Sequence, residues 1–222
     1  MKTQKALIII GFFLSFGLKL QSQDIKYGLH SGLVVSNARV ADKIDIRKDY
    51  RVFYPMYSLN INGFIEYKVS KTWGIAAEPG FITKGGIVRF GINHYMSVID
   101  MKLHYLQLPI VANFYCTNKF FVSIGPEFAY MINSQKNIPA TATGFNDFKE
   151  NAFEISGLIG LHYSISKKVD IGFRYNHGLT KISILKWTDG FGPEIGKSKV
   201  YNQYFQFIFR YILQSAANKQ QA

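Results

Sequence analysis

The sequence predicts an all-β protein, an antiparallel up-and-down barrel of eight strands. Eight runs alternate apolar with polar side chains, as half-buried strands do. Short polar connections between the runs alternate with long ones. Aromatic residues, which favour strands, make up 16% of the chain.

The eight runs follow one another in chain order at 26–36, 57–69, 73–83, 103–115, 120–132, 153–165, 169–179 and 200–213. In the second run Leu59 and Ile61 alternate with Ser58, Asn60 and Asn62. The last run gathers Phe and Tyr on one side. Each run therefore has an apolar and a polar face, and the last run is expected to close the barrel against the first.

The connections indicate how the strands are linked. Tight turns are expected at 70–72, 116–119 and 166–168, and long polar loops at about 37–56, 84–102, 133–151 and 181–199. Because the strands run up and down, all the short turns lie at one end of the barrel and all the loops at the other.

Residues 1–23 are predicted to be a signal peptide. A basic start, MKTQK, precedes the apolar run ALIIIGFFLSFGL and a polar exit, KLQSQ. A membrane anchor is the weaker alternative, because the apolar run is short and Lys19 interrupts its end. No later segment has the roughly 20 apolar residues of a membrane helix. We expect the barrel to span 24–213 and a polar tail to occupy 214–222.

Either face of such strands could meet water. A soluble barrel points its apolar face inward, whereas an outer-membrane barrel points it toward lipid. The even strand number, strands longer than the usual 5 or 6 residues, the alternation of short turns with long loops and the signal peptide favour the membrane barrel. The predicted location is the cell outer membrane.

Charge and cysteine content limit the possible partners. The net charge is +12, or +9 after removal of Lys2, Lys5 and Lys19 with the signal peptide, but the basic residues are spread along the chain. We therefore expect contact with outer-membrane lipid and lipopolysaccharide phosphates and not with nucleic acid. Cys116 is the single cysteine and forms no internal disulfide.

Charged residues in the polar register predict an ion-pair network inside the barrel. The charged members of this register include Glu66, Lys68, Glu78, Glu127, Glu154, Arg174 and Arg210, and the network is predicted to consist of all of these except Lys68. Paired carboxylates can also serve acid–base chemistry. We expect instead that these charges form ion pairs with one another, because an isolated buried charge is costly. At least one carboxylate should lie within salt-bridge distance of Arg174 or Arg210.

Three prolines stand inside predicted strands: Pro79, Pro109 and Pro126. Proline has no N–H to donate to the ladder. We expect β-bulges at these residues, and a weakened gate between strands is the alternative.

No catalytic, cofactor or metal site is predicted. The five histidines show no ligand spacing, and a single Cys completes no zinc set. A lipid-modifying enzyme that uses His94, His104 and His177 with Asp189 is kept as a minor alternative, since no Ser/His/Asp spacing supports it.

The order of several short motifs resembles a known family. YGLHSGLVVSN, HYLQLPIVANFY, VSIGPEFAYMI and FEISGLIGLHYSISKKVDIGFRYNHGLTKI, with the aromatic last strand, are similar to the PorT-like outer-membrane β-barrel family of Bacteroidota. The resemblance implies an integral barrel of about eight strands, like small OmpA and OmpX barrels. One founding member of the family is linked to a secretion system. The tail after Leu213 departs from barrels that end on an aromatic residue.

These observations favour a non-enzymatic, monomeric barrel with a structural or interaction role, whose partners belong to the cell envelope or secretion machinery. A small channel or transporter is the alternative. Eight strands leave an interior just wide enough for side chains, which argues against a large pore.

Overall fold

The computed structural model describes residues 25–41, 53–92, 95–137, 151–188 and 194–215. No helix in these ranges is long and apolar enough to cross a membrane. The strands are β1 (Ile25–Ala41), β2 (Phe53–Tyr54), β3 (Met56–Lys68), β4 (Trp73–Ala77), β5 (Gly80–Ile92), β6 (Tyr95–Tyr115), β7 (Phe120–Asn137), β8 (Phe153–Ser164), β9 (Val169–Gly178), β10 (Ser183–Thr188) and β11 (Glu194–Ser215).

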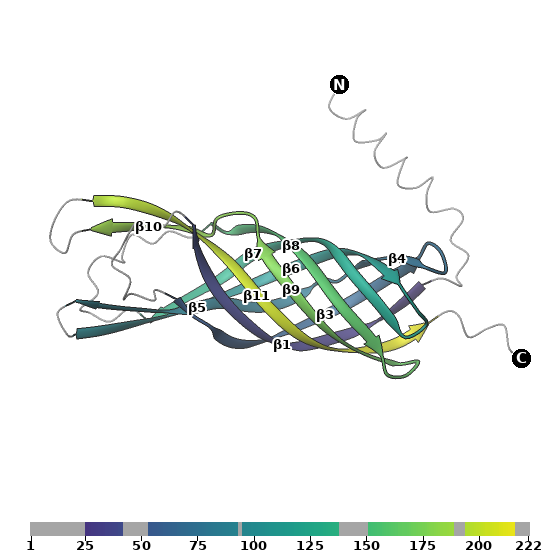
Figure 1. The fold of residues 1–222 in the computed structure, drawn as a ribbon. Coiled ribbons are helices and arrows are strands. Elements are labelled where there is room, and N and C mark those ends of the chain that lie inside the picture. The colour runs from purple at the N-terminus through teal and green to yellow at the C-terminus, as the bar shows by residue number, and fades with distance from the viewer. Residues whose placement is uncertain (1–24, 42–52, 93–94, 138–150, 189–193, 216–222) are drawn as a thin grey trace, which may run out of the picture.

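The sheet closes on itself because β1 pairs with both β3 and β11. From β11 the ring passes through β9, β8, β7 and β6, and returns to β3 through β4 and β5, with every pair antiparallel. Since β4 and β5 follow each other along one side of β3, the ring has eight positions (Figure 1). The eight-stranded antiparallel barrel is confirmed, and so is the pairing of the first run with the last.

The two ends of the barrel differ. Short turns join β3 to β4, β6 to β7 and β8 to β9 at the end where β1 begins and β11 finishes; we call it the turn end (Figure 1). At the opposite end, the hairpin end, β5 pairs with β6 and β10 with β11 in hairpins that project beyond the ring.

The long loops predicted at 84–102 and 181–199 are therefore largely strands. Ile87, Val88 and Ile99 are β-branched residues that favour strands, and the charged residues among them hid this preference. Residues 42–52 and 138–150 of the other two expected loops lie outside the described residues, as does the expected signal peptide. β11 continues to Ser215, two residues beyond its expected end.

The three prolines do not shift the register. The β3 ladder has the same register with β4, before Pro79, as with β5, after it. Pro126 pairs with Gly157 in an unbroken ladder, and the pairs on either side of the short gap after Pro109 share one register. Register shifts lie instead at Tyr27/Gly28, His104/Tyr105 and Trp187/Thr188. The bulges predicted at the prolines are thus not found there.

The carbonyl groups explain why the register survives. Gly63 N donates to Pro79 O at 2.9 Å, and Glu78 N donates to Pro109 O, also at 2.9 Å. Pro79 and Pro109 each remove one N–H from the ladder but keep their carbonyl group as an acceptor.

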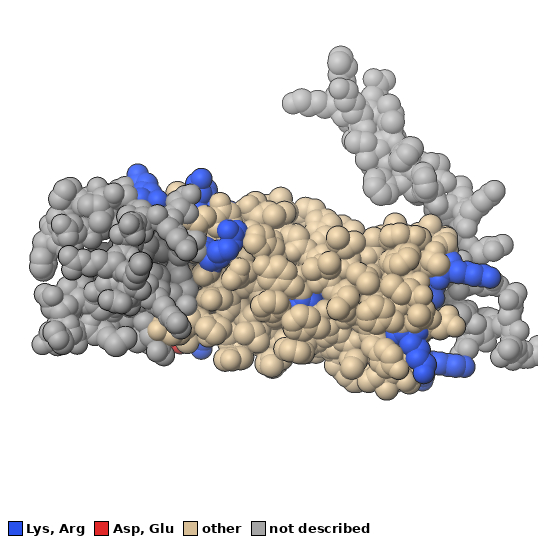
Figure 2. All heavy atoms as spheres, viewed as in Figure 1, with Lys and Arg blue, Asp and Glu red and all other residues tan. Residues whose placement is uncertain are grey.

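The side chains are arranged inside out. Large apolar residues face outward on every strand of the ring, and exposure reaches 70% for Tyr57 and 68% for Leu59. Lys and Arg gather toward the two ends of the barrel (Figure 2). Exposed aromatic residues form a belt near the turn end: Tyr27, Tyr67, Trp73, Tyr163 and Tyr211. An apolar band bordered by aromatic residues is the outer surface of a barrel that stands in a bilayer.

Candidate functional site

Polar and charged side chains fill the interior of the barrel. The structure places all six predicted lumen residues there with at most 1% of each residue exposed: Glu66, Glu78, Glu127, Glu154, Arg174 and Arg210. Glu78 stands between β4 and β5, and the other five come from five different strands. Their contacts form three layers along the barrel, which we name the turn-end, middle and hairpin-end layers.

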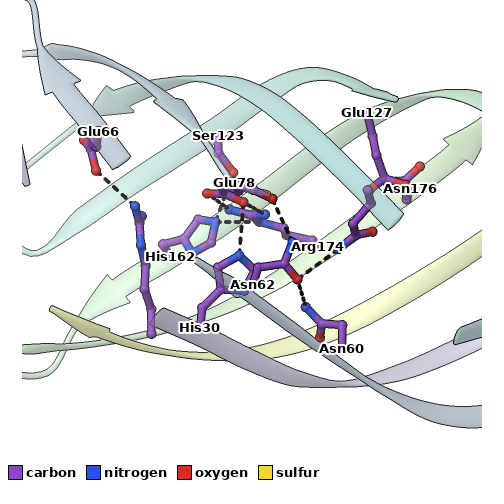
Figure 3. Close-up of polar contacts among 12 residues, drawn as sticks. His30, Asn60, Asn62, Glu66, Glu78, Ser123, Glu127, His162, Arg174 and Asn176 are labelled. Atoms are coloured by element: carbon purple, nitrogen blue, oxygen red, sulfur yellow. Dashed lines mark hydrogen bonds and ion pairs between the residues drawn. The ribbon is translucent and has the colours of Figure 1, made fainter. Parts of the chain in front are cut away.

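Glu78 and Arg174 form the middle layer (Figure 3). Arg174 Nη2 donates to Glu78 Oε1 at 2.8 Å, and Nη1 donates to Oε2. His30 Nε2 lies 3.3 Å from Glu78 Oε2, and Arg174 Nε donates to His162 Nε2 at 3.2 Å. Because β9 stands opposite the β4–β5 position in the ring, the Glu78–Arg174 pair crosses the lumen.

Two glycines make room for the middle layer. A Cβ added to Gly160 would stand 2.6 Å from Arg174 Cγ, and one added to Gly172 would stand 2.7 Å from His162 Cε1. The ring of Phe121 stacks on His162 with 4.6 Å between centroids. The glycines of the polar register thus accommodate the bulky side chains of neighbouring strands.

The turn-end layer contains two ion pairs. Arg210 Nη2 lies 3.2 Å from Glu66 Oε2, and its guanidinium lies over the ring of Phe64 at 3.7 Å. Tyr115 also donates its hydroxyl to Glu66. Lys26 Nζ lies 3.4 Å from Asp170 Oδ2, which completes the layer.

The hairpin-end layer is centred on Lys84. Its Nζ lies 2.7 Å from Glu127 Oε1 and 3.5 Å from Glu154 Oε1. Neutral groups satisfy the second oxygen of each carboxylate. Tyr204 Oη donates to Glu127 Oε2 at 2.5 Å, and Asn202 Nδ2 donates to Glu154 Oε2 at 2.8 Å. Asn176 Nδ2 donates to Glu127 Oε2 as well, at 2.9 Å.

The layers nearly balance in charge. Among the described residues of the three layers, five carboxylates face four Lys or Arg cations. The predicted set missed Lys26, Lys84 and Asp170, and also the histidines of the middle layer. Lys84 is an even number of positions after Glu78, so it falls on the same, inward face. Extending the predicted strand 73–83 by one residue would have identified it as a lumen residue.

The structure describes two of the four candidate enzyme residues. His94 and Asp189 lie outside the described residues. His104 and His177 stand in the outward register, where they contact Thr83 and Tyr175 at 3.0 and 2.8 Å. Among the described residues no group of three His, Cys, Asp or Glu could hold a metal ion. Cys116 lies exposed in the β6–β7 turn.

The chain was compared with known proteins. Residues 21–183 match the family model described as outer membrane protein beta-barrel domain. A search of curated proteins found no significant match.

Similar solved structures include Ail of Yersinia pestis, at 13% identity and a TM-score of 0.45, covering 86% of this chain and 99% of Ail. OprG of Pseudomonas aeruginosa has 13% identity and a TM-score of 0.46, with 86% of this chain and 94% of OprG covered. Neisserial surface protein A has 11% identity and a TM-score of 0.42, with 83% and 96% covered. By its family match, this chain belongs to the outer membrane protein beta-barrel domain family and is a protein of the cell outer membrane.

Proposed function

We propose that this protein is a non-conducting, non-enzymatic barrel that acts as a monomeric structural or interaction protein through its two ends. The observation that carries the proposal is the filled lumen. Three layers of buried ion pairs and hydrogen bonds occupy it, and the Glu78–Arg174 pair crosses it. An eight-stranded barrel has room for little else.

The turn end supports an interaction role. Five exposed lysines lie in or beside its three turns: Lys68, Lys71, Lys119, Lys167 and Lys168. The turn segments 70–72, 116–119 and 165–168 contain no Asp or Glu. In an outer-membrane barrel the short turns face the periplasm. A basic periplasmic surface suits an anionic envelope partner, and its affinity should fall with salt.

The hairpin end supports contact with lipopolysaccharide. Lys102, Lys181 and Lys199 are exposed there, on the side that faces outward from the cell in such barrels. Phosphates of lipopolysaccharide are the anionic groups that this surface would meet.

Membership of the PorT-like family, and with it a role in secretion, is the finer part of the proposal. The sequence resemblance supports it. Crosslinking of the protein in its native outer membrane tests the role in secretion. The experiment compares wild type with a variant in which Lys71, Lys119 and Lys168 are changed to Glu. Recovery of secretion components with wild type alone would support the role.

Conductance in planar bilayers tests the filled lumen. We expect no discrete channels from the wild-type protein, because the middle layer crosses the lumen. The double variant Glu78→Ala with Arg174→Ala removes that crossing but leaves the other two layers, so conductance gained by this variant would assign the block to the middle layer. Regular wild-type channels would instead establish the alternative, a small channel or transporter.

A further inference from the structure

We infer that the outer wall of the barrel carries a binding site for an uncharged amphiphile, a molecule with an aliphatic chain and a hydroxyl or amide head group. A cavity of about 630 Å³ is lined by residues of β1, β3, β5, β6 and β7. Most of the lining residues belong to the outward register. The site goes beyond the proposed function because it opens on the lipid-facing wall and does not need a conducting lumen.

An interruption of the wall helps to create the cavity. Within the described residues, β3 pairs with β5 only over residues 60–62 and 80–82. Residues 56–59 pair with β1 on one side but have no ladder to residues 83–86 on the other. Among the described residues, the edge of β5 that faces away from β6 is paired again only at Ile87 and Val88, where it meets β2. A side-chain bond, from Ser58 Oγ to Thr83 O at 2.6 Å, stands in the gap.

A second irregularity lies on the far side of the same hairpin. The β6–β7 register shifts at His104/Tyr105, which leaves Ile132 as an extra residue on β7. Bulges bend a strand and increase its twist. Because the β5–β6 hairpin is irregular along both edges, it can depart from the cylinder and leave a hollow in the wall.

The lining has an apolar and a polar part, and Ser31, which pairs with Ile61, and Leu59, which lies one outward position nearer the hairpin end, depart from a strict division along the barrel. Ile61 and Phe81 pair with each other on the side nearer the turn end. Thr83, His104 and Asn133 lie in one row of the ladder, one outward position nearer the hairpin end. An aliphatic chain fits the apolar part, which continues the lipid-facing band, and a polar head group fits the row above it.

The lining also indicates that the head group carries no charge. None of the residues around the cavity is Lys, Arg, Asp or Glu. The head-group row supplies a hydroxyl, an imidazole and amides, together with Gln135 at the next outward position. No lining residue offers a counter-charge to a charged head group, and Lys102, which pairs with Gln135, stands beyond the head-group row; a hydroxyl or amide finds both donors and acceptors within the lining.

His104 gives the most specific indication of a ligand. Its Nδ1 lies 3.0 Å from Thr83 Oγ1. Its Nε2 is shielded from solvent and has no hydrogen-bond partner among the described residues. Leaving a buried polar nitrogen unpaired is unfavourable. Because Nε2 is covered in this structure, a ligand reaches it only when the ring turns toward the cavity, and a ligand hydroxyl or amide then pairs with it in either tautomer.

The experiment uses the full protein in lipid nanodiscs and a photoreactive N-acyl ethanolamine, which has an aliphatic chain and an uncharged head. A fatty acid of the same chain length with the same photoreactive group is the charged comparison. Peptide mapping should find the acyl ethanolamine on peptides that contain residues 81–83, 104 and 131–135. Labelling there should exceed that of the fatty acid about fivefold, the effect of roughly one hydrogen bond.

Variants tie the labelling to the cavity. His104→Phe removes the unpaired nitrogen and should lower labelling about fivefold. Thr83→Trp fills the hollow and should abolish labelling. Leu108→Trp is the matched control, because Leu108 is an exposed residue of β6 that does not line the cavity. The shift in gel mobility between heated and unheated samples confirms that each variant is folded.

Equal labelling by both probes, labelling spread evenly around the wall, or labelling unchanged in both His104→Phe and Thr83→Trp would overturn the proposal. Mass spectrometry of the protein taken from its own membrane separates the two sources of ligand. A bilayer lipid retained by wild type and lost in Thr83→Trp identifies a resident lipid. Probe labelling without a retained lipid identifies an amphiphile that diffuses to the site.

Discussion

In the middle layer one carboxylate, that of Glu78, receives both terminal nitrogens of Arg174 and lies beside His30. In the hairpin-end layer one ammonium group, that of Lys84, stands between two carboxylates, those of Glu127 and Glu154. Both layers are buried in the same lumen. They differ in charge balance: the middle layer pairs one carboxylate with one guanidinium, whereas the hairpin-end layer has one carboxylate in excess.

The difference shows how neutral groups complete each layer. The spare N–H of Arg174 is accepted by His162, whereas the spare carboxylate oxygens of the hairpin-end layer accept from Tyr204 and Asn202. The guanidinium and carboxylate meet in a two-pronged geometry that fixes their orientation. The ammonium of Lys84 acts as a point charge with three donors. The middle layer should therefore depend on geometry, and the hairpin-end layer on charge balance.

The largest effect is expected for Lys84→Met. It leaves two buried carboxylates without their cation, and breaking a buried ion pair costs about 3–5 kcal/mol, so we expect the upper end of that range. Urea unfolding in lipid vesicles, followed by tryptophan fluorescence and gel mobility, measures the free energy of unfolding.

The control removes the excess charge. Lys84→Met combined with Glu127→Gln and Glu154→Gln leaves no unpaired buried charge, so most of the lost stability should return. A triple variant as unstable as Lys84→Met alone would show that packing of the lysine stem, and not charge balance, dominates the hairpin-end layer.

A smaller loss is expected for Glu78→Gln in the middle layer. The amide oxygen of Gln still accepts one bond from Arg174, so the cost should be near 3 kcal/mol, the lower end of the range for a broken buried pair. The same unfolding measurement detects it.

Arg174→Lys sharpens the comparison because it keeps the charge and removes the two-pronged contact. If geometry holds the middle layer, this variant should lose about as much stability as Glu78→Gln. If Arg174→Lys were as stable as wild type, charge balance alone would hold the middle layer, as it holds the hairpin-end layer.

Alternation along the chain predicted the ring of strands and the face on which each residue lies. Tyr57 and Leu59 are exposed, and Asn60 and Asn62 are buried, as a period of two requires. In the sequence pattern, the charged residues of the projecting hairpins indicate loops and outweigh the β-branched residues between them. Within the bilayer a strand is marked by regularly alternating apolar residues, and this alternation is weaker where the strand extends beyond the bilayer.

Pairing inside the lumen was less accessible to sequence reasoning. Glu78 and Arg174 are 96 positions apart and meet across the ring. The stagger of the strands in the closed barrel decides which side chains lie at the same height along its axis, and this stagger is a property of the whole ring. The residue types, and the pairing of carboxylates with Arg174 and Arg210, could therefore be predicted, but not which carboxylate each arginine takes. The wall cavity was missed because register shifts such as the one at His104/Tyr105 leave no clear mark in the alternation.

The smallest effect is expected for Tyr204→Phe, which removes one neutral partner from the hairpin-end layer. The hydroxyl donates to Glu127 at 2.5 Å and accepts from Asn176 at 2.8 Å. A hydrogen bond to a charged group contributes about 1.5–3 kcal/mol, so the variant should lose less stability than Lys84→Met. Tyr211→Phe is the matched control, because Tyr211 faces outward and its change should stay within about 0.5 kcal/mol. If Tyr204→Phe matched this control, Lys84 alone would balance both carboxylates, and the contrast between the two layers would lose its basis.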